Sequence, residues 1–110
     1  MDIEKLLAEI KAQLLVLLQE NYKDFIPELE KDVTNFLKVS KEKLERWTLL
    51  LVDKSITQDD FNWLVKSQKE LLVLQALQTA GMSKIKLNSL KNSVIKIIIN
   101  TTAKAVLGGL

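Results

Sequence analysis

Residues 53–81 read DKSITQDDFNWLVKSQKELLVLQALQTAG, and this stretch carries the clearest helix-start and helix-stop signals in the chain. Thr57 can cap the N-terminus of a helix. Asp60, three residues later, can accept a hydrogen bond from the Thr57 N–H and so complete a capping box. Gly81 occupies the position at which a residue in the left-handed conformation commonly ends a helix. These signals predict one helix over residues 58–80.

Three further stretches show the spacing of apolar residues that is typical of amphipathic helices, and they predict helices over residues 2–20, 27–53 and 88–107. A short turn joins the helices 27–53 and 58–80, so we expect them to form a long antiparallel hairpin. The predicted fold class is therefore all-α, in a single domain. The N- and C-terminal helices flank the hairpin as in a four-helix bundle, which is either complete in one chain or completed by oligomerisation.

The two tryptophans of the chain lie on either side of this turn. Trp47 and Trp63 are each eight residues from Ser55, and residues equally distant from the turn of an antiparallel hairpin lie at the same height. Tryptophan has a large apolar side chain that usually packs against its neighbours. We therefore expect Trp47 and Trp63 to be anchors near the closed end of the hairpin.

The composition argues against an enzyme. Among the 110 residues there is no Cys and no His, so the commonest general base and the commonest metal ligands are absent. The sequence has no Gly-rich phosphate-binding loop, and its carboxylates mostly have Lys or Arg three or four residues away, as in solvated ion pairs on helices. We expect a non-enzymatic protein with no cofactor, no metal and no small-molecule substrate.

The first residues, MDIEKLLAEIK, have acids where a secretory signal peptide has a basic flank. The longest uninterrupted apolar run, Leu14–Leu18, is much shorter than a signal-peptide core or a membrane span. These two features predict a cytoplasmic protein.

Charge is distributed unevenly along the chain. Residues 82–110 contain five lysines and no acid, a charge of +5, whereas residues 1–81 contain 11 basic residues and 14 acids, a charge of −3. A cationic amphipathic helix of this kind can bind an anionic membrane surface or an acidic partner, here through Lys91, Lys96 and Lys104. We expect no nucleic-acid partner, because these lysines do not share one helical stripe and no aromatic residue accompanies them.

Self-association explains the most features together. The helices predicted over residues 2–20, 58–80 and 88–107 carry more apolar surface than a single helix seam would cover, and excess apolar surface on a small chain indicates an interface. We predict a helical interaction or assembly protein that self-associates, as a dimer. Two alternatives stay open, a peripheral membrane-binding protein and a regulatory adaptor for another protein. The predicted interface consists of apolar residues on the first and last helices: Leu7, Leu14, Leu18, Val94, Ile97, Ile98 and Ala105.

Overall fold

The computed structural model describes residues 2–108, and within that range the chain is an all-α bundle without β-strands. The bundle is elongated, with extents of 42 × 23 × 19 Å. This confirms the predicted fold class. In chain order the elements are α1 (Ile3–Asn21), the 3-10 turn η1 (Lys23–Phe25), α2 (Ile26–Val52), α3 (Gln58–Ser67), the 3-10 turn η2 (Gln68–Leu71), α4 (Gln75–Thr79) and α5 (Lys84–Gly108).

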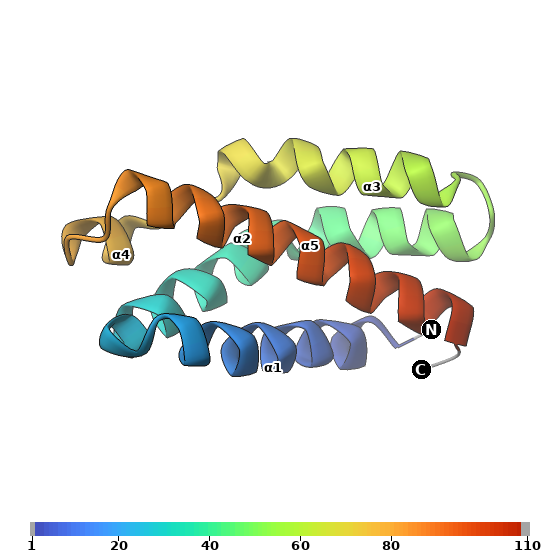
Figure 1. The fold of residues 1–110 in the computed structure, drawn as a ribbon. Helices are drawn as coiled ribbons and strands as arrows, with labels where there is room; N and C mark the ends of the chain where they lie inside the picture. Colours follow the sequence, from blue (N-terminus) through green and yellow to red (C-terminus); the bar gives the residue numbers. More distant parts are fainter. Residues whose placement is uncertain (1, 109–110) are drawn as a thin grey trace.

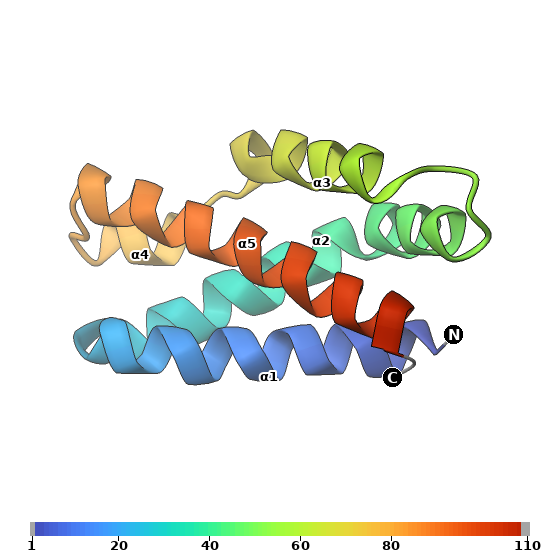
Figure 2. The ribbon, with the colours of Figure 1, turned by 45° about the vertical axis from the view of Figure 1, so that its right-hand side comes forward.

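Helix α5 lies in the middle of one broad face of the bundle, between α1 and α3 (Figure 1). It runs antiparallel to α1, and α2 lies behind it in both views (Figures 1 and 2). Helix α3 turns back along the C-terminal half of α2, as expected for a helical hairpin, and α4 packs near the start of α2. The apolar side of α5 is therefore covered by its neighbours, and its opposite side faces solvent.

The core is a continuous cluster of Leu, Ile and Val side chains with Phe61 among them. Helix α1 contributes an apolar side chain every third or fourth residue, which is the spacing of one helical face. Burying each such side chain contributes about 1.5–3 kcal/mol. The largest fully buried side chains come from all five helices and the segment before α4: Ile10, Leu14, Leu18, Leu29, Phe61, Leu72, Leu77, Leu90 and Ile98.

The start of α3 has the predicted capping box. The Asp60 N–H donates to Thr57 Oγ1 at 3.1 Å, and the Thr57 N–H donates to Asp60 Oδ2 at 3.0 Å. These two bonds satisfy donors that the first turn of a helix otherwise leaves unpaired. The local signal therefore fixes where the second arm of the hairpin begins.

The single helix predicted over residues 58–80 is wrong, because the structure divides it. Helix α3 ends at Ser67, η2 follows, and the chain is extended at Leu72 before α4 begins at Gln75. Leu72 and Leu74 are buried while Val73 between them is exposed, the alternation of an extended segment. In one straight helix, Leu72, Leu74 and Leu77 would spread around much of the circumference, and the break lets all three enter the core.

A buried carboxylate from α2 holds the start of α4 in place. Asp32 is only 4% exposed, and it accepts hydrogen bonds from the Ala76 N–H at 3.0 Å and the Leu77 N–H at 2.9 Å. The residue at the N-cap of α4 is Leu74, which has no polar side chain to do this. Asp32 is therefore a cap supplied from 44 residues away in sequence, and it also complements the positive end of the helix dipole.

Gly81 has the predicted left-handed conformation, with φ of +95°. The Gly81 N–H donates to the Gln78 carbonyl and the Met82 N–H to the Leu77 carbonyl, both at 3.1 Å. This pair of bonds is a Schellman motif, and it ends α4 so that the chain can turn into α5. Helix α5 begins at Lys84 rather than near Asn88, because the hydroxyl of Ser83 caps it by accepting from the Lys86 N–H at 3.2 Å.

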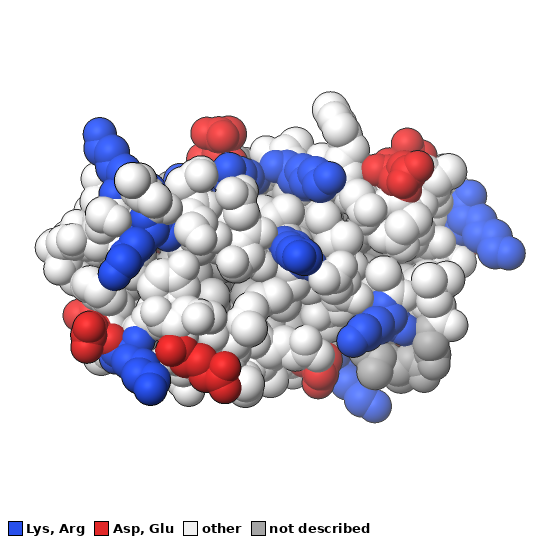
Figure 3. Space-filling view, viewed as in Figure 1, with Lys and Arg blue, Asp and Glu red and all other residues white. Residues whose placement is uncertain are grey.

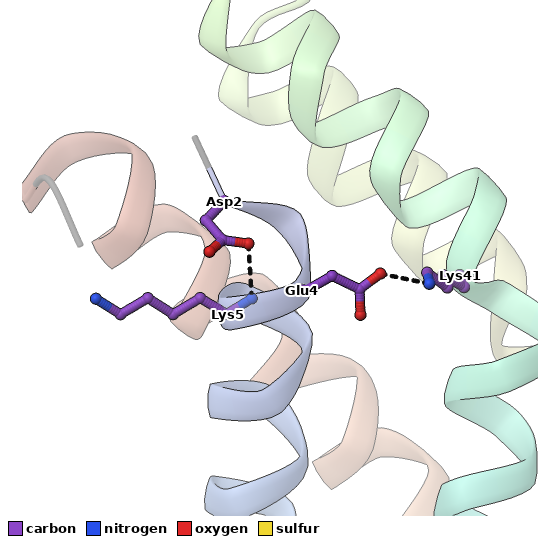
Figure 4. Close-up of polar contacts among 4 residues, drawn as sticks. All are labelled: Asp2, Glu4, Lys5 and Lys41. Atoms are coloured by element: carbon purple, nitrogen blue, oxygen red, sulfur yellow. Dashed lines mark hydrogen bonds and ion pairs between the residues drawn. The ribbon is translucent and has the colours of Figure 1, made fainter.

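Polar contacts also fix the start of α1 (Figure 4). Asp2 Oδ1 accepts from the Lys5 N–H at 3.1 Å and caps the helix. Two residues further, Glu4 forms an ion pair with Lys41 of α2, and this hydrogen bond and charge raise the pKa of the Lys41 amine. Both side chains are exposed, so the ion pair orients α1 against α2 more than it stabilises the fold.

Candidate functional site

The predicted interface residues lie mainly inside the single chain. Five of them are at most 1% exposed, and the other two, Leu7 and Ile97, are partly buried against the same core. Helices α1 and α5 pack against each other, so these side chains form a contact within one chain. An interface with a second copy would have to use other side chains. The five fully buried residues are Leu14, Leu18, Val94, Ile98 and Ala105.

Of the two predicted hairpin anchors, only Trp47 packs against the core. Trp63 is 70% exposed. Phe61 and Val65 of α3 point into the core, and Trp63 lies two residues from each of them, which places it on the opposite side of the helix. Trp63 is therefore an exposed aromatic side chain and not an anchor of the hairpin.

The three lysines predicted to contact a membrane or acidic partner do not act together. Lys96 and Lys104 are exposed on α5, while Lys91 is partly buried on another side of the same helix. The apolar side of α5 is packed in the bundle, so it could reach a membrane only if the helix left the core. Within residues 2–108, no helix combines the length and the continuous hydrophobicity that crossing a membrane requires.

Lys96 belongs instead to a groove of about 520 Å³ between α3 and α5. Its apolar side chains are Ile95 and Ile99 of α5, and its polar side chains are amides and amines. Among the described residues no carboxylate lines the groove or forms an ion pair with its lysines. We call this site the lysine groove, and it is lined by Asn62, Lys66, Lys69, Asn92, Ile95, Lys96 and Ile99.

The spacing of polar residues in the sequence contains a signal for this groove. Asn62, Lys66 and Lys69 are spaced by four and three residues, which places them along one side of a helix. Asn92 and Lys96 have the same relation on the last helix. The lysines after residue 82 do not define the groove by themselves, because the packing of α3 against α5 is not visible in the sequence.

A second surface, on α1, has the opposite charge. A shallow hollow of about 400 Å³ is bordered by apolar side chains between carboxylates, and within it Val16 is 65% and Leu17 is 42% exposed. The Gln13 amide donates to Glu9 at 2.9 Å and holds one of these carboxylates in place. We call this surface the α1 stripe, and it consists of Glu9, Ala12, Gln13, Val16, Leu17 and Glu20.

The α1 stripe and the lysine groove lie on the same broad face of the bundle. Gln13 follows Glu4 by nine residues, which is two and a half helical turns, so the two side chains point to opposite sides of α1. Glu4 is paired with Lys41 of α2, and Gln13 therefore points away from α2. That direction is the side of α1 next to α5. Figure 3 shows this face, with lysines over α5 and α3, and with acidic side chains interspersed with basic ones along the lower edge, where α1 lies. Acidic side chains also border its upper edge.

The other prominent hollow, of about 750 Å³, lies where α4 packs near the start of α2. Its buried carboxylate, Asp32, is already occupied as the cap of α4. The part of the chain that the structure describes contains no group of three or more carboxylates that could hold a metal ion. The cap explains Asp32, while Glu28, which also lines this hollow, has one buried carboxylate oxygen without a hydrogen-bond partner among the described residues.

No family model, curated protein or solved structure matches this chain. The function must therefore be inferred from the surfaces that the fold presents. The two with a definite chemical character are the lysine groove and the α1 stripe.

Proposed function

We propose that this protein is a non-enzymatic helical interaction protein that self-associates as a dimer. The observation that supports the proposal is the presence of two chemically complementary surfaces on one face of the chain. The lysine groove has amines that form no ion pair among the described residues, beside Ile99 and the largely buried Ile95, and the α1 stripe has carboxylates around exposed Val16 and Leu17. Opposite charges around apolar centres are the usual composition of a specific protein interface.

The interface assigned here differs from the one expected from sequence. The expected interface used the inward faces of the first and last helices, which the chain buries itself. The proposed interface uses their outward faces together with α3. An adaptor that binds an acidic amphipathic helix of another protein would use the same lysine groove. A second copy is the preferred occupant because the chain itself carries a segment of that kind.

Solution mass tests the proposal. At about 50 mM salt we expect light scattering to give twice the chain mass of 12.5 kDa, that is 25 kDa. At about 500 mM salt the Debye length falls to a few Å, the attraction between exposed charges weakens, and the mass should move toward 12.5 kDa. A mass of 12.5 kDa at low salt over the whole accessible range of protein concentration would contradict self-association.

A further inference from the structure

Building on the proposed self-association, we propose that two copies pair through unlike surfaces. The α1 stripe of each copy occupies the lysine groove of the other, and a two-fold axis relates the copies. The occupant of the groove is thus a second copy of this chain, and each dimer contains the same contact twice.

The two surfaces can be compared along their length. Glu9 and Glu20 are eleven residues apart, or about 16 Å along α1 at 1.5 Å per residue. The lysine groove follows α3 and η2 from Asn62 to Lys69, about 10 Å by the same measure. The two carboxylates are therefore farther apart than the α3 side of the groove is long, and the length and flexibility of the lysine side chains let them meet, while Val16 lies toward Ile99. A helix laid in a groove with apolar contacts at its centre is a recurrent mode of recognition.

The placement of both surfaces on one face decides the symmetry. In this face α1 lies along one long edge and α3 along the other (Figures 1 and 3). A two-fold axis that lies in the plane of the face and runs parallel to the long axis of the bundle places α1 of each copy over α3 of the other copy. Both contacts then form at once, and the assembly closes. If the two surfaces lay on opposite faces, the same contact would produce open chains instead.

Charge also excludes the alternative pairing of like surfaces. Placing one lysine groove on another would bring Lys66 and Lys69 of both copies together without carboxylates between them. Like charges brought together across an interface cost several kcal/mol, so this arrangement is disfavoured. The pairing of groove with stripe instead brings the two glutamates of one copy to the three lysines of the other.

Charge reversal tests the pairing. The groove variant carries Lys66→Glu and Lys69→Glu, and the stripe variant carries Glu9→Lys and Glu20→Lys. Each should weaken self-association at least tenfold (about 1.4 kcal/mol or more), because close interfacial charge pairs couple by that much and reversal makes them repel. The variant with all four changes should recover self-association to within about threefold of the wild type, since the signs again match. The readout is the dimer dissociation constant from sedimentation, with helicity checked by circular dichroism.

The matched control for the groove variant carries Lys38→Glu and Lys43→Glu on the exposed side of α2, which changes the net charge by the same amount. It should dimerise like the wild type. Two results would overturn the pairing but leave self-association standing. In the first, the wild type dimerises and the groove variant has the same dissociation constant. In the second, the variant with all four changes dimerises as weakly as the groove variant and the stripe variant. A monomeric wild type would contradict both.

Discussion

Replacing Ile98 by aspartate is expected to unfold the chain. Ile98 is fully buried in α5, between the helices on either side, and it belongs to the central apolar cluster. A carboxylate at this position would be buried without a partner, or would have to be protonated, at a cost of several kcal/mol. Domains of this size are stable by about 5–15 kcal/mol, so this substitution removes much or all of the margin. Circular dichroism at 222 nm and thermal unfolding measure the effect.

The control for this substitution lies on the same helix. Ile85→Asp makes the same chemical change at a side chain that is 84% exposed, and it should leave the unfolding temperature within a few degrees of the wild-type value. If Ile98→Asp kept its helical signal and lost only self-association, Ile98 would belong to an interface between chains. Unfolding by both variants would show that the burial of Ile98 is not the reason for its sensitivity.

Replacing Asp32 by alanine should cost about 2–4 kcal/mol of stability. The substitution removes two charge-assisted hydrogen bonds to the Ala76 and Leu77 N–H groups and leaves those donors without a partner at a largely buried helix start. The break before α4 depends on this cap, so Leu72 and Leu77 would lose their fixed positions in the core. Chemical denaturation with urea measures the loss as a fall in the midpoint at constant slope.

Two comparisons make the Asp32 result specific. Glu30→Ala removes an exposed carboxylate from the same turn of α2 and should change stability by no more than about 0.5 kcal/mol. Asp32→Asn keeps one acceptor oxygen but loses the charge and the second acceptor, so its loss should lie between those of alanine and wild type. Equal stability of Asp32→Ala and wild type would contradict the role of Asp32 as the cap of α4.

The sequence predicts those parts of the fold that depend on residues close together in the chain. The capping box at Thr57 and Asp60 and the left-handed Gly81 were predicted because both signals act within a few residues. The break between α3 and α4 was missed because it depends on Asp32, which lies 44 residues from its partner Ala76. Where a helix ends because of a side chain that is distant in the sequence, the local spacing of apolar residues does not show the end.

The apolar width of the last helix was predicted, but not what covers it. Val94, Ile98 and Ala105 stand out in the sequence as an apolar face, and such a face can be buried by another chain or by the same one. In the structure α1 and α3 cover it. The choice depends on how the four long segments are arranged in space, which the pattern of a single helix does not contain.

The lysine groove shows the same limit. The spacing of Asn62, Lys66 and Lys69 predicts a polar side of α3, and Asn92 and Lys96 predict one on α5. Only the packing of α3 against α5 brings these side chains to one groove with Ile95 and Ile99 between them. A site assembled from two helices cannot be read from either one alone.

Mixing the groove variant with the stripe variant tests most directly whether two copies meet through complementary surfaces. Each variant alone should have the monomer mass of 12.5 kDa, because its own groove and stripe repel. In the mixture, the native stripe of the groove variant can bind the native groove of the stripe variant, and the two reversed surfaces can bind each other. We therefore predict a species of 25 kDa, twice the chain mass, with one copy of each variant. An equimolar mixture that stays at 12.5 kDa under conditions in which the wild type dimerises would contradict this assembly.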